Sequence, residues 1–231
     1  VLSDTSEYSL FATGMHSRDY VNCAIDRSDV IITVGFNIVE YPPYIWNQCL
    51  DKKIVSIDFV EAEVDKYYNP DVEVIGNISV SLQQLGGKIL REDGKCFRPL
   101  RQLLDRKLSE DFTGKYPLTP PEVVRHVRNA LAPEDILTLD NGIYKLWFSR
   151  LYRTYRPNTF LLDNALATMG AGLPAGMAAK MLRPDRKVLA VVGDGGFMMN
   201  SQELETAVRY DIPVVVLIIN DNGYGFIRWK Q

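Results

Sequence analysis

Residues 187–226 decide the fold of this chain, and they read KVLAVVGDGGFMMNSQELETAVRYDIPVVVLIINDNGYGF. The runs at 187–192 and 214–219 are short, apolar and rich in β-branched residues, which is typical of buried strands. Between them, residues 201–210 have a helical pattern that Pro213 ends before the second run. A strand, a helix and a strand in this order form a right-handed crossover, so both strands run parallel and end at one edge of a sheet.

An acidic residue follows each of these strands. Asp194 comes after the first strand and Asp221 after the second. The ends of neighbouring strands lie about 4.8 Å apart, and open α/β sheets bind ligands at this carboxyl edge. Two carboxylates that meet there repel each other unless a cation or a shared proton lies between them. An aspartate after a strand is also a common turn or cap residue, which is the alternative for either position taken alone.

Glycines surround both aspartates: Gly193, Gly195, Gly196, Gly223 and Gly225. Glycine lets backbone amides come close to an anion, and loops of free N–H groups bind phosphate. Carboxylate oxygens beside a phosphate site suit Mg²⁺, which takes one or two carboxylates together with phosphate oxygens. The residues by themselves therefore predict a Mg²⁺–diphosphate site.

Two other phosphate-binding patterns are absent from this sequence. A dinucleotide fingerprint would need a glycine at position 198, where Met198 stands. A P-loop, in which Gly-Lys is followed by Ser or Thr, does not occur. A nicotinamide-dependent dehydrogenase is therefore disfavoured.

Strand and helix patterns alternate along most of the chain, which indicates parallel sheets. In the first part we expect strands at 29–36, 52–60 and 72–77, and helices at 17–28 and 78–90. In the second part we expect strands at 136–139, 159–162, 187–192 and 214–219, and helices at 119–131, 144–155, 169–182 and 201–210. We predict an α/β protein with two parallel-sheet domains of the Rossmann-like, doubly wound type, both truncated.

The predicted domains are residues 1–90 and 119–231. Residues 91–118 lose the alternation and are rich in charge, Gly and Pro, so we interpret them as a linker. The chain opens on Val1 and stops at Gln231, just past its most informative loop, which favours a piece of a longer protein.

Two capping patterns mark helix starts. Thr119 precedes two prolines, which predicts a helix with an N-cap threonine and prolines in its first turn. Asn200 and Glu203 have the spacing of a capping box for the helix at 201–210.

Composition excludes several classes of partner. The 231 residues carry a net charge of −3, so nothing indicates nucleic-acid binding. The most basic stretch, 98–107, has leucines at helical spacing and is best interpreted as a solvated helix. Three widely spaced cysteines indicate no disulfide or zinc framework and favour a reducing, cytoplasmic setting. No apolar run is long enough to span a membrane, and no signal peptide opens the chain.

The motif GDG at 193–195, followed after 24 residues by NDN at 220–222, resembles the GDG…N(D/N) motif of thiamine-diphosphate enzymes. The resemblance implies that Mg²⁺ bridges the cofactor diphosphate to the protein. Its ligands would be side-chain oxygens of Asp194 and Asp221 and the backbone carbonyl of Gly223. Many relatives carry Asn at the position of Asp221. The implied cofactor-binding residues are Ala167, Met169, Gly193, Asp194, Gly195, Gly196, Asp221, Gly223, Tyr224 and Gly225.

The segment 164–180, NALATMGAGLPAGMAAK, resembles the one that holds the aminopyrimidine ring in this family. The resemblance implies that Met169 wedges the cofactor into a bent shape and that its amide donates to the ring. The backbone carbonyl of Ala167 would accept from the ring amine. For Met169 taken alone, a buried core methionine is the alternative.

The segment 139–147, LDNGIYKLW, matches the opening loop of the same domain. Relatives often carry Gln-His or Ser-containing residues there that touch the diphosphate. Ile143 and Tyr144 stand in their place, so the sequence assigns no side-chain contact to this loop.

The stretch after Ser201 resembles acetolactate synthases, and more closely the catabolic, FAD-free type. VGFNIVEYPPYIWN at 34–47 replaces the segment that accompanies FAD in biosynthetic relatives, so FAD is not expected. The resemblance implies condensation of two pyruvates to 2-acetolactate and CO₂. Phe226 and Ile227 would line the reaction pocket, with core packing as the alternative.

No catalytic residue is assigned to this chain. In the family, a glutamate on a separate pyrimidine-binding domain, usually from the partner subunit, starts the chemistry, and no segment here resembles that domain. We therefore expect the chain alone to be inactive and the full-length enzyme to be a homodimer or homotetramer. The alternatives are another thiamine-dependent 2-oxo-acid decarboxylase or carboligase, and a non-catalytic oligomerisation module.

Overall fold

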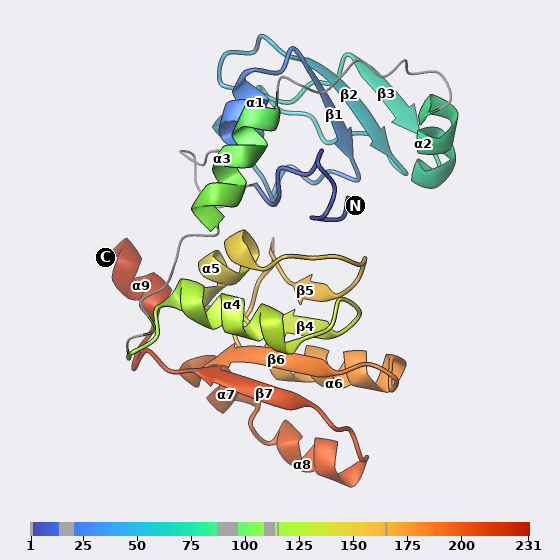
Figure 1. Ribbon diagram of the computed structural model, residues 1–231. Helices are drawn as coiled ribbons and strands as arrows, with labels where there is room; N and C mark the ends of the chain where they lie inside the picture. Colours follow the sequence, from blue (N-terminus) through green and yellow to red (C-terminus); the bar gives the residue numbers. More distant parts are fainter. Residues whose placement is uncertain (1, 14–20, 87–96, 109–113, 115, 165) are drawn as a thin grey trace. The chain divides into compact units, whose positions relative to one another are not determined.

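The computed structural model describes residues 2–13, 21–86, 97–108, 114, 116–164 and 166–231. The chain forms two compact units, one of residues 10–107 and one of residues 1–9 with 108–231. Each unit contains one sheet of parallel strands with helices around it (Figure 1), so the predicted α/β class is confirmed. The predicted domain limits, 1–90 and 119–231, stay a prediction.

The unit of residues 10–107 is built on a three-stranded parallel sheet. Its strands are β1 (Val30–Val34), β2 (Lys53–Asp58) and β3 (Val72–Ile75), paired in that order. The other elements are α1 (Asn22–Asp26), the 3₁₀ turn η1 (Pro43–Ile45), α2 (Ile78–Gly86) and α3 (Arg98–Leu108). Parts of the helices predicted at 17–28 and 78–90 lie outside the described residues.

Aromatic packing makes the core of this unit. Trp46 and Tyr68 are buried beside Ile54 of β2, and Phe36 meets the Trp46 ring edge-on at 6.0 Å between centroids. The Tyr68 hydroxyl shares a 2.7 Å hydrogen bond with Thr33 of β1. A buried hydroxyl needs such a partner, so this bond lets an aromatic core sit directly under a strand.

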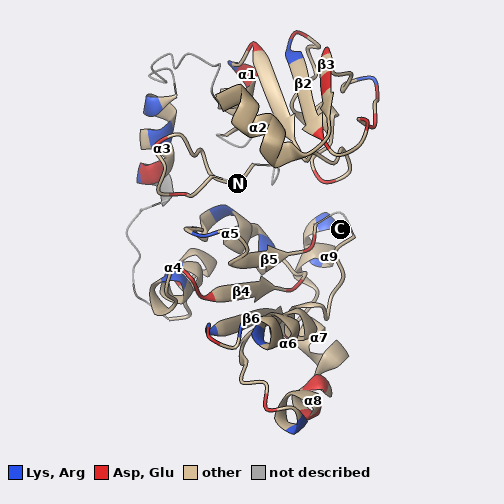
Figure 2. Cartoon of the chain, turned by 90° about the vertical axis from the view of Figure 1, so that its right-hand side faces the viewer, with Lys and Arg blue, Asp and Glu red and all other residues tan. Residues whose placement is uncertain are grey.

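Helix α3 contains the most basic stretch of the sequence. Its Leu100 and Leu104 are buried against α1, while Arg101, Asp105 and Arg106 lie at other positions of the helix (Figure 2). Arg101 forms an ion pair with Asp105 one turn later, at 2.8 Å. The helix therefore has one apolar face and one face of mixed charge, as its leucine spacing predicts.

The second unit has four parallel strands in the order β5-β4-β6-β7 (Figure 1). They are β4 (Ile136–Leu139), β5 (Phe160–Leu162), β6 (Val188–Gly193) and β7 (Val215–Ile219). The helices are α4 (Pro120–Ala130), α5 (Tyr144–Leu151), α6 (Gly172–Leu182), α7 (Asp194–Asn200), α8 (Glu203–Arg209) and α9 (Gly225–Lys230). The chain moves outward from β4 to β5 and then crosses to β6 on the other side. Ligands of open α/β sheets bind at such a switch point.

Helices cover both faces of this sheet. All four residues of β4 are buried. Leu137 and Leu139 pack in the core cluster formed with α4 and α5. Thr138 faces the opposite way and donates to the Gly172 carbonyl at the start of α6, at 2.8 Å. Alternate residues of a strand point to opposite faces, so a fully apolar or hydrogen-bonded strand like β4 belongs at the centre of the sheet.

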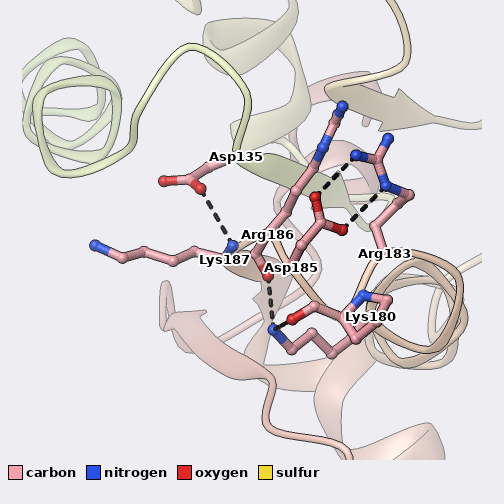
Figure 3. Close-up of polar contacts among 7 residues, drawn as sticks. Asp135, Lys180, Arg183, Asp185, Arg186 and Lys187 are labelled. Carbon is pink, nitrogen blue, oxygen red and sulfur yellow. Dashed lines mark hydrogen bonds and ion pairs between the residues drawn. The ribbon is translucent and has the colours of Figure 1, made fainter.

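A polar network fixes the turn from α6 to β6, at the amino ends of the strands (Figure 3). Lys180 donates to the carbonyls of Pro184 and Arg186, at 3.0 and 2.7 Å. Asp135, just before β4, accepts the backbone N–H of Lys187 at 3.1 Å and that of Ala132 at 2.8 Å. These bonds tie the starts of β4 and β6 together, which sets the register of their carboxyl ends.

Local structure differs from the prediction around β6. Residues 194–200 form the separate helix α7, and α9 follows β7, neither of which the sequence pattern predicted. The predicted capping box of Asn200 and Glu203 is wrong. The N-cap residue of α8 is Gln202, whose side chain makes no capping hydrogen bond. Asn200 instead donates to the Gly170 carbonyl at 2.6 Å. A tertiary partner has replaced the local one.

Thr119 does begin a helix as predicted. Its backbone N–H and its hydroxyl both donate to Glu122, at 2.7 and 2.8 Å, at the start of α4. No helix within the described residues combines the length and the apolar character that a membrane crossing requires.

Candidate active site

A cavity of about 260 Å³ lies at the carboxyl ends of β4, β6 and β7. Each of these strands is followed by a loop or helix that contributes to the wall, and Met169 closes it from the segment before α6. The lining residues are Asn141, Gly142, Ile143, Tyr144, Met169, Gly193, Asp194, Gly195, Gly196, Ile219, Asp221, Gly223, Tyr224, Gly225, Phe226 and Ile227. Of the predicted cofactor-binding residues, Ala167 alone is missing from this wall.

The two aspartates reach the cavity from neighbouring strands. β6 pairs with β7, and Gly193 at the end of β6 stands opposite Ile219 at the end of β7. Asp194 begins α7 directly after β6, and Asp221 follows β7 by two residues. Within the described part of the chain, neither carboxylate forms an ion pair with Lys or Arg. The cavity edge therefore carries uncompensated negative charge, which suits a bound cation.

Several glycines are required by close contacts on this wall. A Cβ at Gly195 would stand 3.0 Å from the Tyr224 ring and 3.1 Å from Met169 Cε. At Gly225 it would lie 2.6 Å from Oδ2 of Asp221. Only the distance at Gly225 is below 3.0 Å, which real Cβ atoms essentially never show; at Gly195 the two neighbouring side chains would have to give by a few tenths of an ångström.

Met169 projects toward the cavity. Its Cε lies beside Gly195, which the Tyr224 ring also approaches, and the residue is half-buried. It belongs to none of the core clusters described. A long, flexible apolar side chain placed there can bear on a ligand.

Asp140 is a site residue that sequence reasoning missed. It follows β4, it is 1% exposed, and its two oxygens accept the backbone N–H groups of Gly170 and Ala171, at 3.0 and 3.1 Å. Asn200 holds the Gly170 carbonyl from the other side. Gly170 has a positive φ of 88°, which favours glycine. These bonds hold the backbone directly after Met169. One sequence signal could have identified Asp140: it follows β4 in the same way as Asp194 follows β6.

Ile143 and Tyr144 line the cavity although the sequence assigned no contact to their loop. Ile143 packs against Gly225. Tyr144 is 6% exposed, and its hydroxyl oxygen is buried without a hydrogen-bond partner of normal geometry in the described residues. Burial, and then the charge of Asp140, raise the pKa of Tyr144 above its ordinary value, while the Gly193 amide acts in the opposite direction. The hydroxyl therefore stays protonated in the working pH range.

Phe226 and Ile227 supply an apolar part of the wall. Both belong to the first turn of α9. Phe226 lies 6.4 Å from the Trp229 ring, centroid to centroid. The cavity thus has a polar end, where the aspartates lie, and apolar surface contributed by these two residues, Met169 and Ile143.

Comparison with known protein families matches both parts of the chain. Residues 140–231 match "Thiamine pyrophosphate enzyme, C-terminal TPP binding domain", and residues 1–85 match "Thiamine pyrophosphate enzyme, central domain". Every residue of the cavity wall falls in the first of these matches.

Individual relatives point the same way. The acetolactate synthase of Bacillus subtilis (strain 168) is 32% identical over 90% of this chain and 37% of its own length. The catabolic acetolactate synthase of Raoultella terrigena is 34% identical over 94% of this chain and 40% of its length. A probable acetolactate synthase large subunit of Methanococcus aeolicus is 29% identical over 100% of this chain and 42% of its length. The chain thus spans about two fifths of the length of these relatives.

Proposed function

Since the chain belongs to the thiamine pyrophosphate enzymes, we propose that its C-terminal cavity binds thiamine diphosphate through a Mg²⁺ ion held by Asp194 and Asp221. The observation that carries this proposal is the position of two carboxylates, neither ion-paired within the described residues, on one glycine-lined wall. Mg²⁺ prefers hard oxygen ligands and keeps phosphate oxygens in its coordination shell. The backbone carbonyl of Gly223, in the same wall, is the proposed third protein ligand.

The character of the wall fits this cofactor. A diphosphate needs a cation and hydrogen-bond donors. The cavity wall has two carboxylates that would hold the cation, and a buried hydroxyl. The aromatic rings of thiamine need apolar contact, which Met169, Ile143 and Phe226 provide. Met169 is the proposed wedge for the bent cofactor, and the backbone of Ala167 and Met169 the proposed partner of its aminopyrimidine ring.

We propose that the protein condenses two pyruvates to 2-acetolactate with release of CO₂. The support is the identity of its relatives, which are acetolactate synthases, one of them catabolic. When bound, the cofactor supplies an electron sink for decarboxylation. Phe226 and Ile227 surround the reaction space with apolar surface, and low polarity favours a step in which charge is lost.

The proposed activity belongs to the complete enzyme. The glutamate that the family resemblance requires has no match in this sequence, so we expect no turnover from these 231 residues alone. We propose a homodimer or homotetramer, so that a second subunit can contribute to the site, and a cytoplasmic setting in keeping with the free Cys23 and Cys49. FAD is not part of the proposal.

Calorimetric titration of thiamine diphosphate into the full-length protein, with and without Mg²⁺, tests the site. We expect binding that depends on Mg²⁺ and is lost in Asp194→Ala, which removes the ligand oxygens. Asp185→Ala is the matched control, because Asp185 is exposed in the α6–β6 turn and pairs with Arg183 at 3.0 Å. Binding by Asp194→Ala equal to that of the wild type would overturn the metal assignment.

Product analysis separates the chemical alternatives. With pyruvate as substrate we expect acetolactate. Acetaldehyde as the main product would instead identify a 2-oxo-acid decarboxylase. If the full-length protein binds no thiamine diphosphate, the alternative of a non-catalytic oligomerisation module takes the place of both.

A further inference from the structure

The ring of Tyr144 lies between two glycines. A Cβ at Gly142 would overlap ring atoms of Tyr144, and a Cβ at Gly193 would stand 3.1 Å from Cε1 and 3.5 Å from the hydroxyl oxygen. The ring therefore folds back toward the end of β6 and brings its hydroxyl next to the residue that precedes Asp194. Neither glycine can acquire a side chain without moving this ring.

The hydroxyl of Tyr144 is buried, and its proton has no hydrogen-bond acceptor of normal geometry among the described residues. The residue is 6% exposed, and the nearby Gly193 amide is itself a donor. Other buried tyrosines of this protein do have partners: Tyr152 accepts from Arg128 at 2.7 Å, and Tyr68 is bonded to Thr33 at 2.7 Å. Because leaving a buried hydroxyl unpaired is costly, the exception at Tyr144 points to a partner that arrives with a ligand.

The surroundings select the chemistry of that ligand. Among the described lining residues, none is Lys or Arg, and the side chains that can donate through N–H or O–H are Asn141, Tyr144 and Tyr224. Tyr224 is largely exposed, so of the two hydroxyl groups only that of Tyr144 is buried. It lies against Gly193, the residue before Asp194, at the acidic end of the cavity. A neutral donor there suits a negatively charged oxygen that a cation has already drawn in.

We propose that the Tyr144 hydroxyl donates a hydrogen bond to a diphosphate oxygen of the bound cofactor. This inference rests on the proposed function and adds a binding residue to it. The diphosphate of this protein is then held by the cation and by neutral donors, with no positively charged side chain from the described cavity wall. Gly142 and Gly193 both make room for the Tyr144 ring.

The test compares Tyr144→Phe with the wild type in the full-length protein. The substitution removes one oxygen and keeps the ring. With Mg²⁺ present, we expect the dissociation constant of thiamine diphosphate to rise about tenfold or more, as for loss of a hydrogen bond to a charged group. The same rise is expected with inorganic diphosphate and Mg²⁺ as the probe, because the lost contact is to the diphosphate.

Thermal unfolding gives a second readout that a purely structural role would not produce. Without ligand, Tyr144→Phe is expected to melt at or above the wild-type temperature, since an unpaired buried hydroxyl has been removed. With cofactor and Mg²⁺ it should gain less stability than the wild type. The control is Tyr152→Phe, in the same core cluster, which should melt lower without ligand and keep wild-type cofactor affinity.

The outcomes separate this inference from the proposed function. If Tyr144→Phe binds thiamine diphosphate with the same affinity as the wild type, the inference is overturned and the proposed function stands. The inference is also overturned if Tyr144→Phe loses affinity for thiamine diphosphate but keeps its affinity for inorganic diphosphate. In that case the hydroxyl would contact another part of the cofactor. A clear drop in the ligand-free melting temperature would show that the hydroxyl already has a partner, with the same consequence. If the wild type binds neither probe, the proposed function falls together with the inference.

Discussion

The carboxylate of Asp140 occupies the space that a side chain on Gly196 would need. An ideal Cβ at position 196 would overlap Oδ2 of Asp140 and come within 3.4 Å of the Gly170 amide. The same carboxylate accepts the N–H groups of Gly170 and Ala171. Asp140 therefore connects the helix that begins with Asp194 to the backbone that follows Met169. The two halves of the proposed cofactor site share this one buried group.

Gly196→Ala should damage the site by overpacking. The added methyl group has to displace Asp140, which is 1% exposed and held by two hydrogen bonds. Overpacking of this kind costs about 1–3 kcal/mol. We expect a lower urea midpoint and weakened cofactor binding, measured by fluorescence and calorimetry. Gly86→Ala is the control, since nothing lies within 4 Å of a Cβ there; equal behaviour of the two variants would contradict the packing argument.

Asp140→Asn tests whether Asp140 positions the backbone after Met169 for cofactor binding or only stabilises the protein. An amide can accept only one of the two N–H groups well, so about 1–3 kcal/mol of stability is expected to be lost. Cofactor affinity should fall as well, because the backbone after Met169 is released.

Asp135→Asn is the matched control for that variant. Asp135 lies at the opposite end of β4, is also buried, and also accepts two backbone N–H groups, from Ala132 and Lys187. It should lose comparable stability and retain cofactor affinity. Equal cofactor affinity in the two variants would show that Asp140 has only a structural role.

Asp221→Asn and Asp221→Ala should behave differently. Asparagine keeps an oxygen that can coordinate Mg²⁺, whereas alanine has none. We expect the asparagine variant to bind thiamine diphosphate in a Mg²⁺-dependent manner and the alanine variant to lose this binding, as followed by titration. Removal of Mg²⁺ by EDTA should abolish binding in the wild type. Wild-type affinity in Asp221→Ala would exclude this residue as a ligand.

Glu122 should make stability depend on pH in the acid range. Hydrogen bonds from the Thr119 backbone and hydroxyl, and then from the Gly114 backbone, lower the pKa of Glu122 below its ordinary value of 4.5. A carboxyl whose pKa is lower in the folded state stabilises the protein above its unfolded pKa. That contribution is lost as the pH falls through the folded value.

The test compares the melting temperatures of Glu122→Gln and the wild type from pH 7 to pH 3. The variant should melt lower than the wild type at pH 7, and the difference should shrink as the pH falls below 4.5. A difference that is the same at every pH would mean that the charge of Glu122 does not contribute.

Much of the fold follows from local pattern. The strands predicted at 136–139 and 214–219 match β4 and β7 to within a residue, because each is a short apolar run bounded by turn residues. The helix after Thr119 follows from its cap and prolines. The order of strands along the chain also brings Asp194 and Asp221 to one edge, since parallel strands end on the same side.

The same local rules fail where a tertiary partner competes. Asn200 has the spacing of a cap for α8, yet it bonds to the Gly170 carbonyl, 30 positions away. Residues 194–200 contain two glycines and were not predicted to be helical, yet they form α7. Packing against the Asp140 carboxylate favours Gly196 there over any residue with a side chain.

The sequence by itself determined the parallel α/β architecture and the pair of aspartates, because periodicity is a local property and the order of strand, helix and strand makes the two strands end at one edge. Only the tertiary structure decided that Asp140 braces the segment after Met169 and that the Tyr144 hydroxyl lies buried and unpaired at the cavity. Those facts depend on which atoms fill the space between Gly142, Gly193 and Gly196. That space is set by how the ends of β4 and β6 and the segment before α6 pack together, and no local stretch of sequence specifies it.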